Sequence, residues 1–128
     1  MTMWWKQVVA AACLVAASAA AVAQRQDSIV VDGSDWMSAS ASERRAFLVG
    51  ASNIIVAENA YAKRRNIAPA PVSAQITKAV DKLTLADIEG RITRWYEANP
   101  SRMSTPVMGV VWREIVRVKQ SAESERIA

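Results

Sequence analysis

The sequence predicts a small all-α protein, a bundle of about four helices that follows an N-terminal signal peptide. Apolar residues recur at every third or fourth position through most of residues 36–120, and cap-forming residues precede several of these runs. The short apolar run at residues 29–31 has no second alternating run with which to pair as a strand. We therefore expect an extended segment at residues 24–35, one helical domain at residues 36–120 and a polar tail at residues 121–128.

The first 23 residues have the pattern of an export signal. Lys6 supplies a positive start, and residues 8–23 form an apolar run that ends in Ala21-Val22-Ala23, the small-x-small pattern of a signal-peptidase site. We predict cleavage after Ala23 and a mature protein in the bacterial periplasm. A lipoprotein would need Cys13 to end a lipobox, but the apolar run continues beyond it.

An uncleaved membrane anchor is the alternative for this segment. The 16 residues from Val8 to Ala23 would rise about 24 Å as a helix, which is less than the hydrocarbon core of about 30 Å. We expect contact with a membrane only if the segment is retained.

The composition excludes several classes of function. The chain has one Cys, no His and a formal charge of +4, and the single Cys lies inside the predicted signal. A disulfide scaffold, a Cys/His metal site and catalysis by imidazole or thiolate are therefore excluded from the mature protein. The four glycines are too dispersed for a phosphate-binding loop. We predict no enzymatic activity, no cofactor, no metal and, for an exported chain of small charge, no nucleic-acid partner.

A long helix is predicted from residue 41 to about residue 65. Ser40 and Glu43 form a capping box, in which each side chain bonds the other's backbone N–H. The helix is apolar on more than one side, so we expect it in the centre of the domain. Trp36 belongs to a short helical turn that folds against the first half of this helix.

Two further helices follow a stiff connector that contains Pro69 and Pro71. Apolar residues at helical spacing mark residues 76–83, and Thr84 with Asp87 caps an amphipathic helix that ends before Pro100.

The last helix is predicted to start at Thr105 as its cap, with Pro106 in the first helical position. Half of its circumference is apolar. That half would cover either the domain's own core or a second copy of the chain in a homodimer.

Glu58 contradicts its surroundings, because it points into the apolar arc of the long helix. A buried carboxylate costs several kcal/mol unless it is paired or protonated. The functional interpretation is an acid that faces a ligand or partner. The structural interpretation is a carboxylate that is paired with an Arg of a neighbouring helix or lifted to the rim.

Aromatic and basic side chains supply the remaining candidates for a binding surface. Trp95 and Trp112 fall at the margins of their apolar arcs, where an amphipathic ring suits a groove or an interface. Trp36 is the third aromatic candidate for the binding surface. Several arginines share helix faces that could meet an acidic partner or anionic lipid headgroups: Arg91, Arg94, Arg113 and Arg117. Of these, we take Arg113 and Arg117 as binding candidates.

Residues 40–118 resemble the Tai-type amidase immunity proteins. The similarity lies in Leu85-Ala86-Asp87-Ile88, in Trp95-Tyr96-Glu97-Ala98-Asn99-Pro100 and in Pro106-Val107, with Arg45-Ala46-Phe47-Leu48-Val49-Gly50 similar to the start of that family's central helix. The resemblance implies a small, exported helical protein that binds and blocks a cell-wall amidase. The family usually carries Cys residues, which residues 24–128 lack.

The sequence thus favours a non-catalytic periplasmic protein that acts by binding another protein, with inhibition of a cell-wall amidase as its sharpest form. The alternative is a structural or lipid-contacting protein of the cell envelope, retained near the inner membrane.

Overall fold

A computed structural model describes residues 28–127 of the chain, which divides into two units, residues 1–30 and residues 31–128. The predicted signal and the cleavage site after Ala23 lie outside the described residues. Of the first unit, the structure describes residues 28–30, which are exposed. The Ser28 hydroxyl donates a hydrogen bond of 3.1 Å to the Val30 carbonyl.

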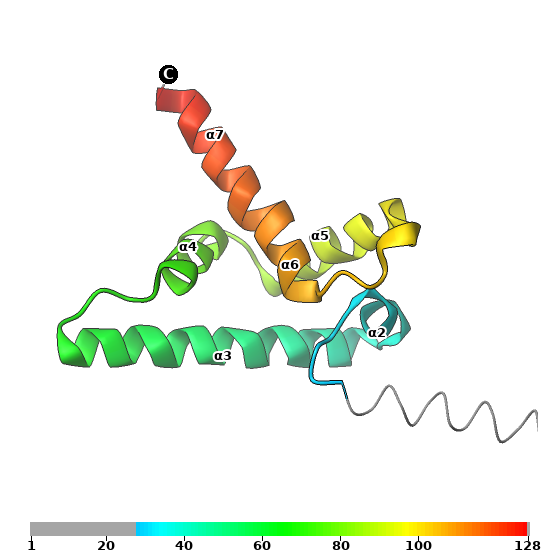
Figure 1. The fold of residues 1–128 in the computed structure, drawn as a ribbon, viewed down its shortest axis with the longest axis horizontal. Helices are drawn as coiled ribbons and strands as arrows, with labels where there is room; N and C mark the ends of the chain where they lie inside the picture. Colours follow the sequence, from blue (N-terminus) through cyan, green and yellow to red (C-terminus); the bar gives the residue numbers. More distant parts are fainter. Residues whose placement is uncertain (1–27, 128) are drawn as a thin grey trace, which may run out of the picture. The chain divides into compact units, whose positions relative to one another are not determined.

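The second unit is helical, which confirms the predicted all-α class. In residues 31–127 the only strand-like pairing is a single antiparallel bridge between Asp32 and Pro106. The helices are α2 (Gly33–Ser38), α3 (Ala41–Arg65), α4 (Pro71–Val80), α5 (Leu85–Ala98), η1 (Pro100–Arg102), α6 (Val107–Val111), the π-helical turn η2 (Trp112–Arg117) and α7 (Val118–Ile127). The last three run on from one another as one rod (Figure 1).

No helix within residues 28–127 has the length and apolarity that crossing a membrane requires.

Capping boxes begin three of the helices. Those of Ser40 with Glu43 and of Thr84 with Asp87 confirm the predicted starts of α3 and α5. The third corrects a predicted boundary, because the helical domain begins at Gly33 and not at residue 36. The Asp32 side chain accepts from the N–H groups of Ser34 and Asp35, and this bonding starts a helix within the segment expected to be extended.

The core lies between α2, α5 and the α6–η2 rod. Its seven fully buried large side chains come from α2 (one), from α5 (two) and from the rod (four): Trp36, Ile92, Tyr96, Val107, Val110, Ile115 and Val116. Tyr96 Oη donates to the Thr105 carbonyl at 2.7 Å, and Trp36 Nε1 donates to the Thr93 hydroxyl at 3.0 Å, so both buried rings have a partner for their polar atom.

The expectation that α3 occupies the centre of the domain is wrong. Only Leu48 and Ala62 of its residues are buried, and Ile54 is 73% exposed. The helix contacts α4 and α5 along one face (Figure 1). Its other faces are almost as apolar but have no helix of the described chain against them.

The rod begins and ends differently from the prediction. Thr105 makes no side-chain cap, and Pro106 precedes the first helical residue. The Val107 N–H instead donates to the Val31 carbonyl at 2.9 Å, so a neighbouring segment takes the place of a cap.

The predicted polar tail at residues 121–128 is helical as far as Ile127. No residue of α7 is buried, as expected for a polar segment. Polar side chains fasten α7 to α4, since Lys119 pairs with Asp81 at 2.7 Å and Glu123 pairs with Lys78 at 2.7 Å.

Candidate functional site

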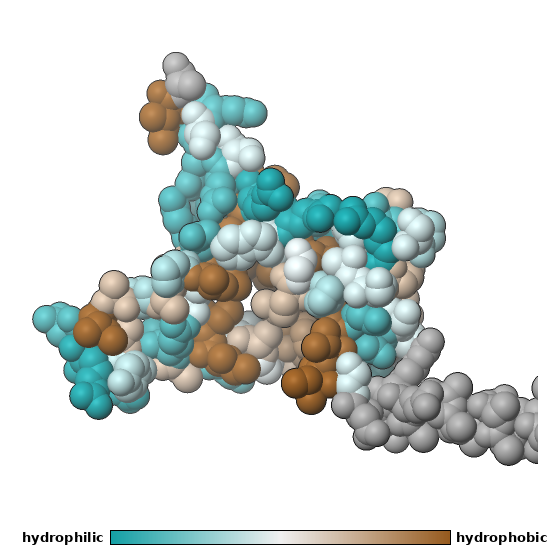
Figure 2. All heavy atoms as spheres, in the orientation of Figure 1, coloured by the Kyte–Doolittle hydropathy of each residue, from teal (hydrophilic) through white to brown (hydrophobic). Residues whose placement is uncertain are grey.

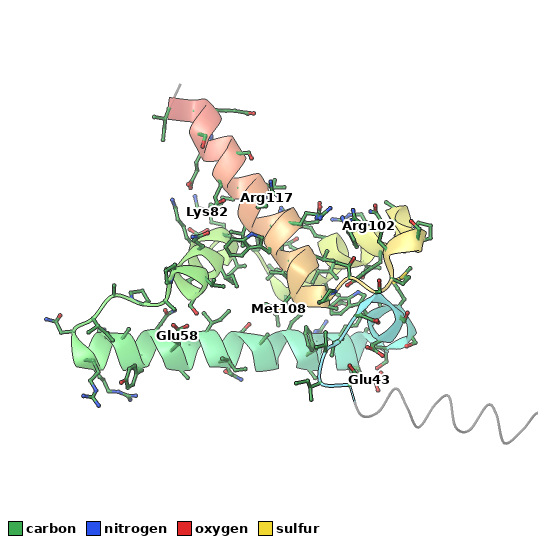
Figure 3. The ribbon with its side chains drawn as sticks, in the orientation of Figure 1. Glu43, Glu58, Lys82, Arg102, Met108 and Arg117 are labelled. Atoms are coloured by element: carbon green, nitrogen blue, oxygen red, sulfur yellow. The ribbon has the colours of Figure 1, made fainter. Side chains whose placement is uncertain are left out.

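Glu58 serves a structural purpose at the start of α4. Its Oε1 accepts from the Ala70 N–H at 3.1 Å, and its Oε2 accepts from the Ser73 hydroxyl. Ala70 is the N-cap residue of α4 and has no side chain that could cap the helix, so a carboxylate from α3 supplies the acceptor. Glu58 is half-buried between the two helices (Figure 3). Of the two structural alternatives for Glu58, pairing with an Arg is wrong, because a backbone N–H and a hydroxyl take that place.

Trp36 does not belong to a binding surface. Its ring is 1% exposed and packs edge-to-face on Phe47 at a centroid distance of 6.3 Å. Arg44 lies over the ring at 5.6 Å and donates to the Trp36 carbonyl at 2.7 Å. This prediction was wrong because the ring enters the core at the junction of α2, α3 and α5.

Trp95 and Arg113, two of the predicted binding residues, lie together. The Arg113 guanidinium carbon is 5.6 Å from the centroid of the Trp95 ring, and that of Arg102 is 5.8 Å from the same centroid. We call these three residues the Trp95 patch. Trp95 is 8% exposed, whereas both arginines are exposed. The two cations therefore form the outer surface, and the indole holds them from below.

Neither cation of the Trp95 patch has a carboxylate partner among residues 28–127. The described residues contain two ion pairs, both made by lysines of α4 and α7. Glu97 and Glu114, which lie on the same helical segments as Trp95 and Arg113, do not pair with either arginine. Two guanidinium groups on one indole thus leave a concentrated positive charge that an external anion could neutralise.

Arg117 extends this surface along the rod, whereas Trp112 does not. Arg113 and Arg117 line a shallow hollow with Val118, Ser121, Ala122 and Glu125. Val118 is 50% exposed, so an apolar side chain lies beside the cations. Arg102 and Arg117 lie on the side of the rod that faces away from α3, whereas Met108 faces α3 (Figure 3). Trp112 is half-buried and packs against the core.

Arg102 was missed by the sequence analysis. It is the last residue of the single 3₁₀ turn η1, which begins at Pro100, and no helical periodicity links it to Trp95. The one available signal was Pro100, which follows the end of α5. A tight turn at this proline folds the chain back toward the end of that helix.

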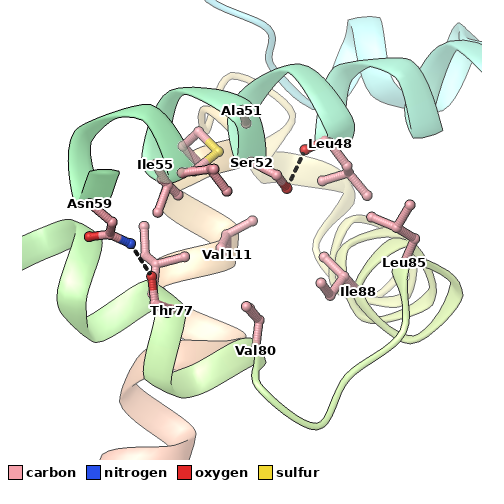
Figure 4. Close-up of a pocket in the computed structure, with 13 residues that line it drawn as sticks. Leu48, Ala51, Ser52, Ile55, Asn59, Thr77, Val80, Leu85, Ile88 and Val111 are labelled. Atoms are coloured by element: carbon pink, nitrogen blue, oxygen red, sulfur yellow. Dashed lines mark hydrogen bonds between the residues drawn. The ribbon is translucent and has the colours of Figure 1, made fainter. Parts of the chain in front are cut away.

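A second hollow, which we call the apolar groove, lies between α3, α4, α5 and α6. Figure 2 shows hydrophobic side chains around it. Its volume is about 200 Å³, more than the roughly 150 Å³ of a cavity that accepts benzene. The side chains drawn in Figure 4 line it, and none is charged: Leu48, Ala51, Ser52, Ile55, Val56, Asn59, Ile76, Thr77, Val80, Leu85, Ile88, Met108 and Val111.

The polar atoms of the apolar groove are bonded to the protein, with one exception. Ser52 donates to the Leu48 carbonyl at 2.8 Å, and Thr77 donates to the Ser73 carbonyl at 2.8 Å. With its proton committed, the Thr77 oxygen accepts from Asn59 Nδ2 at 3.1 Å. This bond fixes the amide and leaves the buried Asn59 Oδ1 with no donor (Figure 4).

Residues 28–127 hold no group of three or more acidic, His or Cys side chains that could bind a metal ion. Two surfaces of this part of the chain are candidates for binding, one cationic and aromatic, the other neutral and apolar.

No protein-family model, curated protein or solved structure matches the chain.

Proposed function

We propose that the chain is a non-catalytic periplasmic protein that acts by binding another protein, and that the Trp95 patch is its contact surface. The observation that carries the proposal is the stacking of Arg102 and Arg113 on Trp95, with no carboxylate of the described part of the chain paired with either cation. Trp and Arg dominate the energetically important positions of protein interfaces. A surface of this kind suits a partner that offers Asp or Glu side chains.

The apolar parts of the same surface support a protein as the partner. Val118 and the hollow beside Arg117 provide contact area next to the charges. Guanidinium groups held on a ring lose less side-chain entropy on binding than free ones, because their positions are already restricted. The patch thus combines a fixed charge with an adjoining apolar contact.

The sharpest form of the proposal is inhibition of a cell-wall amidase. Its support is the resemblance of residues 40–118 to the Tai-type immunity proteins, together with the predicted export. It predicts that the purified protein abolishes the cell-wall hydrolysis of the amidase it recognises at nanomolar concentration. A survey of such amidases with no inhibition at all would contradict this form.

Charge reversal tests the contact surface itself. The Arg113→Glu variant removes one stacked cation and places a like charge before an acidic partner, so partner capture from periplasmic extract should fall at least about tenfold. Arg126→Glu is the matched control, since Arg126 is an exposed arginine at the far end of α7. Equal capture by both variants would contradict the assignment.

The alternative function, contact with the cell envelope, rests on the same cations, which attract anionic headgroups. Flotation with vesicles that contain anionic lipid separates the two proposals. Binding to such vesicles that is lost in Arg113→Glu, without capture of any protein, would favour the envelope function.

A further inference from the structure

The outward face of α3 carries a line of exposed residues that no other part of the described chain covers. Seven residues at alternating spacings of three and four lie along it, and every one of them is exposed: Glu43, Ala46, Gly50, Asn53, Ala57, Ala60 and Arg64. We call this line the α3 seam. Such spacing keeps one side of a helix facing a second helix over several turns.

The middle of the α3 seam is small and uncharged. Gly50 has no heavy atom within 4 Å of the position that a Cβ would occupy, so the space before it is open. Small residues along a seam allow two helices to pack closely, with an interaxial distance near the short end of the usual range of about 8–10 Å.

Larger apolar side chains flank this line on both sides. Val49 and Val56 lie along one side, 42% and 62% exposed, and Ile54 and Tyr61 lie along the other, 73% and 49% exposed. Two helices that meet along the small residues would bury these flanking side chains against each other. A helix that is apolar on more than one side is typical of a central position in a domain, and α3 is covered on one face only.

We propose that a second copy of this chain covers the α3 seam, and that the two α3 helices pack antiparallel. Within the seam itself, the two ends carry opposite charges, Glu43 at the start and Arg64 at the end. The other cations of these turns lie outside the seam: Arg44, Arg45, Lys63 and Arg65. Antiparallel packing about an axis between Asn53 and Ile54 places Glu43 opposite Arg64 of the second copy, and the reverse. Parallel packing would place like charges together, and it would also align the two helix dipoles unfavourably.

The same axis matches the sizes of the side chains across the interface. Gly50 falls opposite Ala57 of the second copy, and Ala46 falls opposite Tyr61. Small residues thus meet a small or a large neighbour, and the two large residues of the seam, Glu43 and Arg64, meet as opposite charges. This match within one sequence is the reason for choosing a second copy as the occupant.

The size of the contact determines how tight the dimer is. From Glu43 to Arg64 the seam is about 32 Å long at 1.5 Å per residue, and a helix is about 10 Å across. Each copy would bury roughly 300 Å², well below the 800 Å² or so of a standard stable interface. We expect a dimer that forms and dissociates with concentration, in the micromolar range or weaker.

Sedimentation of the purified protein from about 10 µM to about 1 mM tests this inference, since a weak dimer changes its average mass over that range. The Gly50→Glu variant places a charge in the centre of the seam and should raise the dissociation constant at least about tenfold. The same change replaces a helix-interior glycine whose side is open, so the melting temperature at low concentration should rise. Loss of the dimer with a raised melting temperature cannot come from unfolding.

Ala122→Glu is the matched control, because it adds a charge at an exposed position of α7 and should leave the dimer unchanged. A wild-type protein that stays monomeric throughout, or a Gly50→Glu variant that dimerises as well as wild type, would overturn the proposal.

Cysteine cross-linking tests the orientation independently of Gly50. In a Cys13→Ser background, which removes the only cysteine, Asn53→Cys lies beside the axis and should form an intermolecular disulfide under mild oxidation. Ala46→Cys should not, because antiparallel packing separates the two copies of residue 46 by roughly 22 Å along the helix. Efficient cross-linking through Ala46→Cys would show parallel packing and contradict the model of the interface.

Discussion

The backbone of Gly33 lies directly against the ring of Tyr96. A Cβ on Gly33 would overlap Cδ1 and Cε1 of that ring and would also come within 2.9 Å of the Met103 carbonyl oxygen. The Gly33 N–H donates to the same carbonyl at 2.8 Å. This contact joins α2 to the end of α5, and it leaves no space for a side chain.

Gly33→Ala should therefore destabilise the protein by about 1–3 kcal/mol, because the fully buried Tyr96 ring cannot move without disturbing the core. Urea unfolding followed by circular dichroism measures this loss. The control is Gly50→Ala, where the space is open and the better helix former should stabilise by about 0.5–1 kcal/mol. An unchanged stability in Gly33→Ala would show that α2 is not packed as described.

Glu58→Ala should lower the free energy of unfolding by about 1–3 kcal/mol. The change leaves the Ala70 N–H and the buried Ser73 hydroxyl without their acceptor, and an unsatisfied buried donor costs more than the lost bond itself. Chemical denaturation checks the loss. The double variant with Ser73→Ala should cost less than the sum of the two single variants, because both remove the same bond; strict additivity would contradict the pairing.

The protein should lose stability in acid below about pH 5. Hydrogen bonds from the backbone N–H and hydroxyl of Ser40 lower the pKa of Glu43, and those of Thr84 lower the pKa of Asp87. Each carboxylate therefore stabilises the fold above its ordinary pKa, and this contribution is lost as the pH falls through the lower pKa of the folded state. Melting temperatures measured between about pH 6 and about pH 2 check the trend.

Asp87→Asn is the variant that tests this acid dependence. It removes the titrating group at the start of α5, so its melting temperature should depend less steeply on pH than that of wild type. A curve parallel to that of wild type would mean that the carboxylate has the same pKa in the folded and unfolded chains.

At alkaline pH, Tyr96 should titrate late. Burial of the ring raises the pKa of Tyr96 to about 12, from an ordinary value of 10.0, and the Asp32 carboxylate adds to the shift. Tyr96 therefore ionises at a lower pH in the unfolded chain than in the folded one. Its contribution to the free energy of unfolding is complete below about pH 10 and is lost as the pH rises toward about 12. Phenolate absorbance should show a late component that Tyr96→Phe lacks and Tyr61→Phe retains.

Local signals in the sequence predicted several helix boundaries correctly. Ser40 and Thr84 each bond to a residue three positions away, so a short stretch of sequence contains the whole interaction. The cap at Asp32 follows the same rule with Asp35, but the preceding apolar residues suggested an extended segment. Most of the all-α fold follows from interactions of this range.

The position of α3 and the Trp95 patch depend on contacts between distant residues. A helix that is apolar on more than one side does not show which of those sides its neighbours will cover, so the exposed face of α3 could not be predicted. Arg102 and Arg113 reach Trp95 from two different segments, and only the folded chain brings them onto one ring. The prediction for Trp36 was wrong for the same reason, since packing against α3 and α5 decides how deeply its ring is buried.

The π-helical turn at Trp112–Arg117 fixes the rotational phase of everything that follows it. A π turn holds more residues per turn than an α-helical one, so returning these residues to α-helical geometry without deleting any of them would rotate α7 by about 100°. Lys119 would then swing away from Asp81, and Glu123 away from Lys78. The irregular turn thus works as a spacer whose length decides which side of the C-terminal helix meets its neighbour.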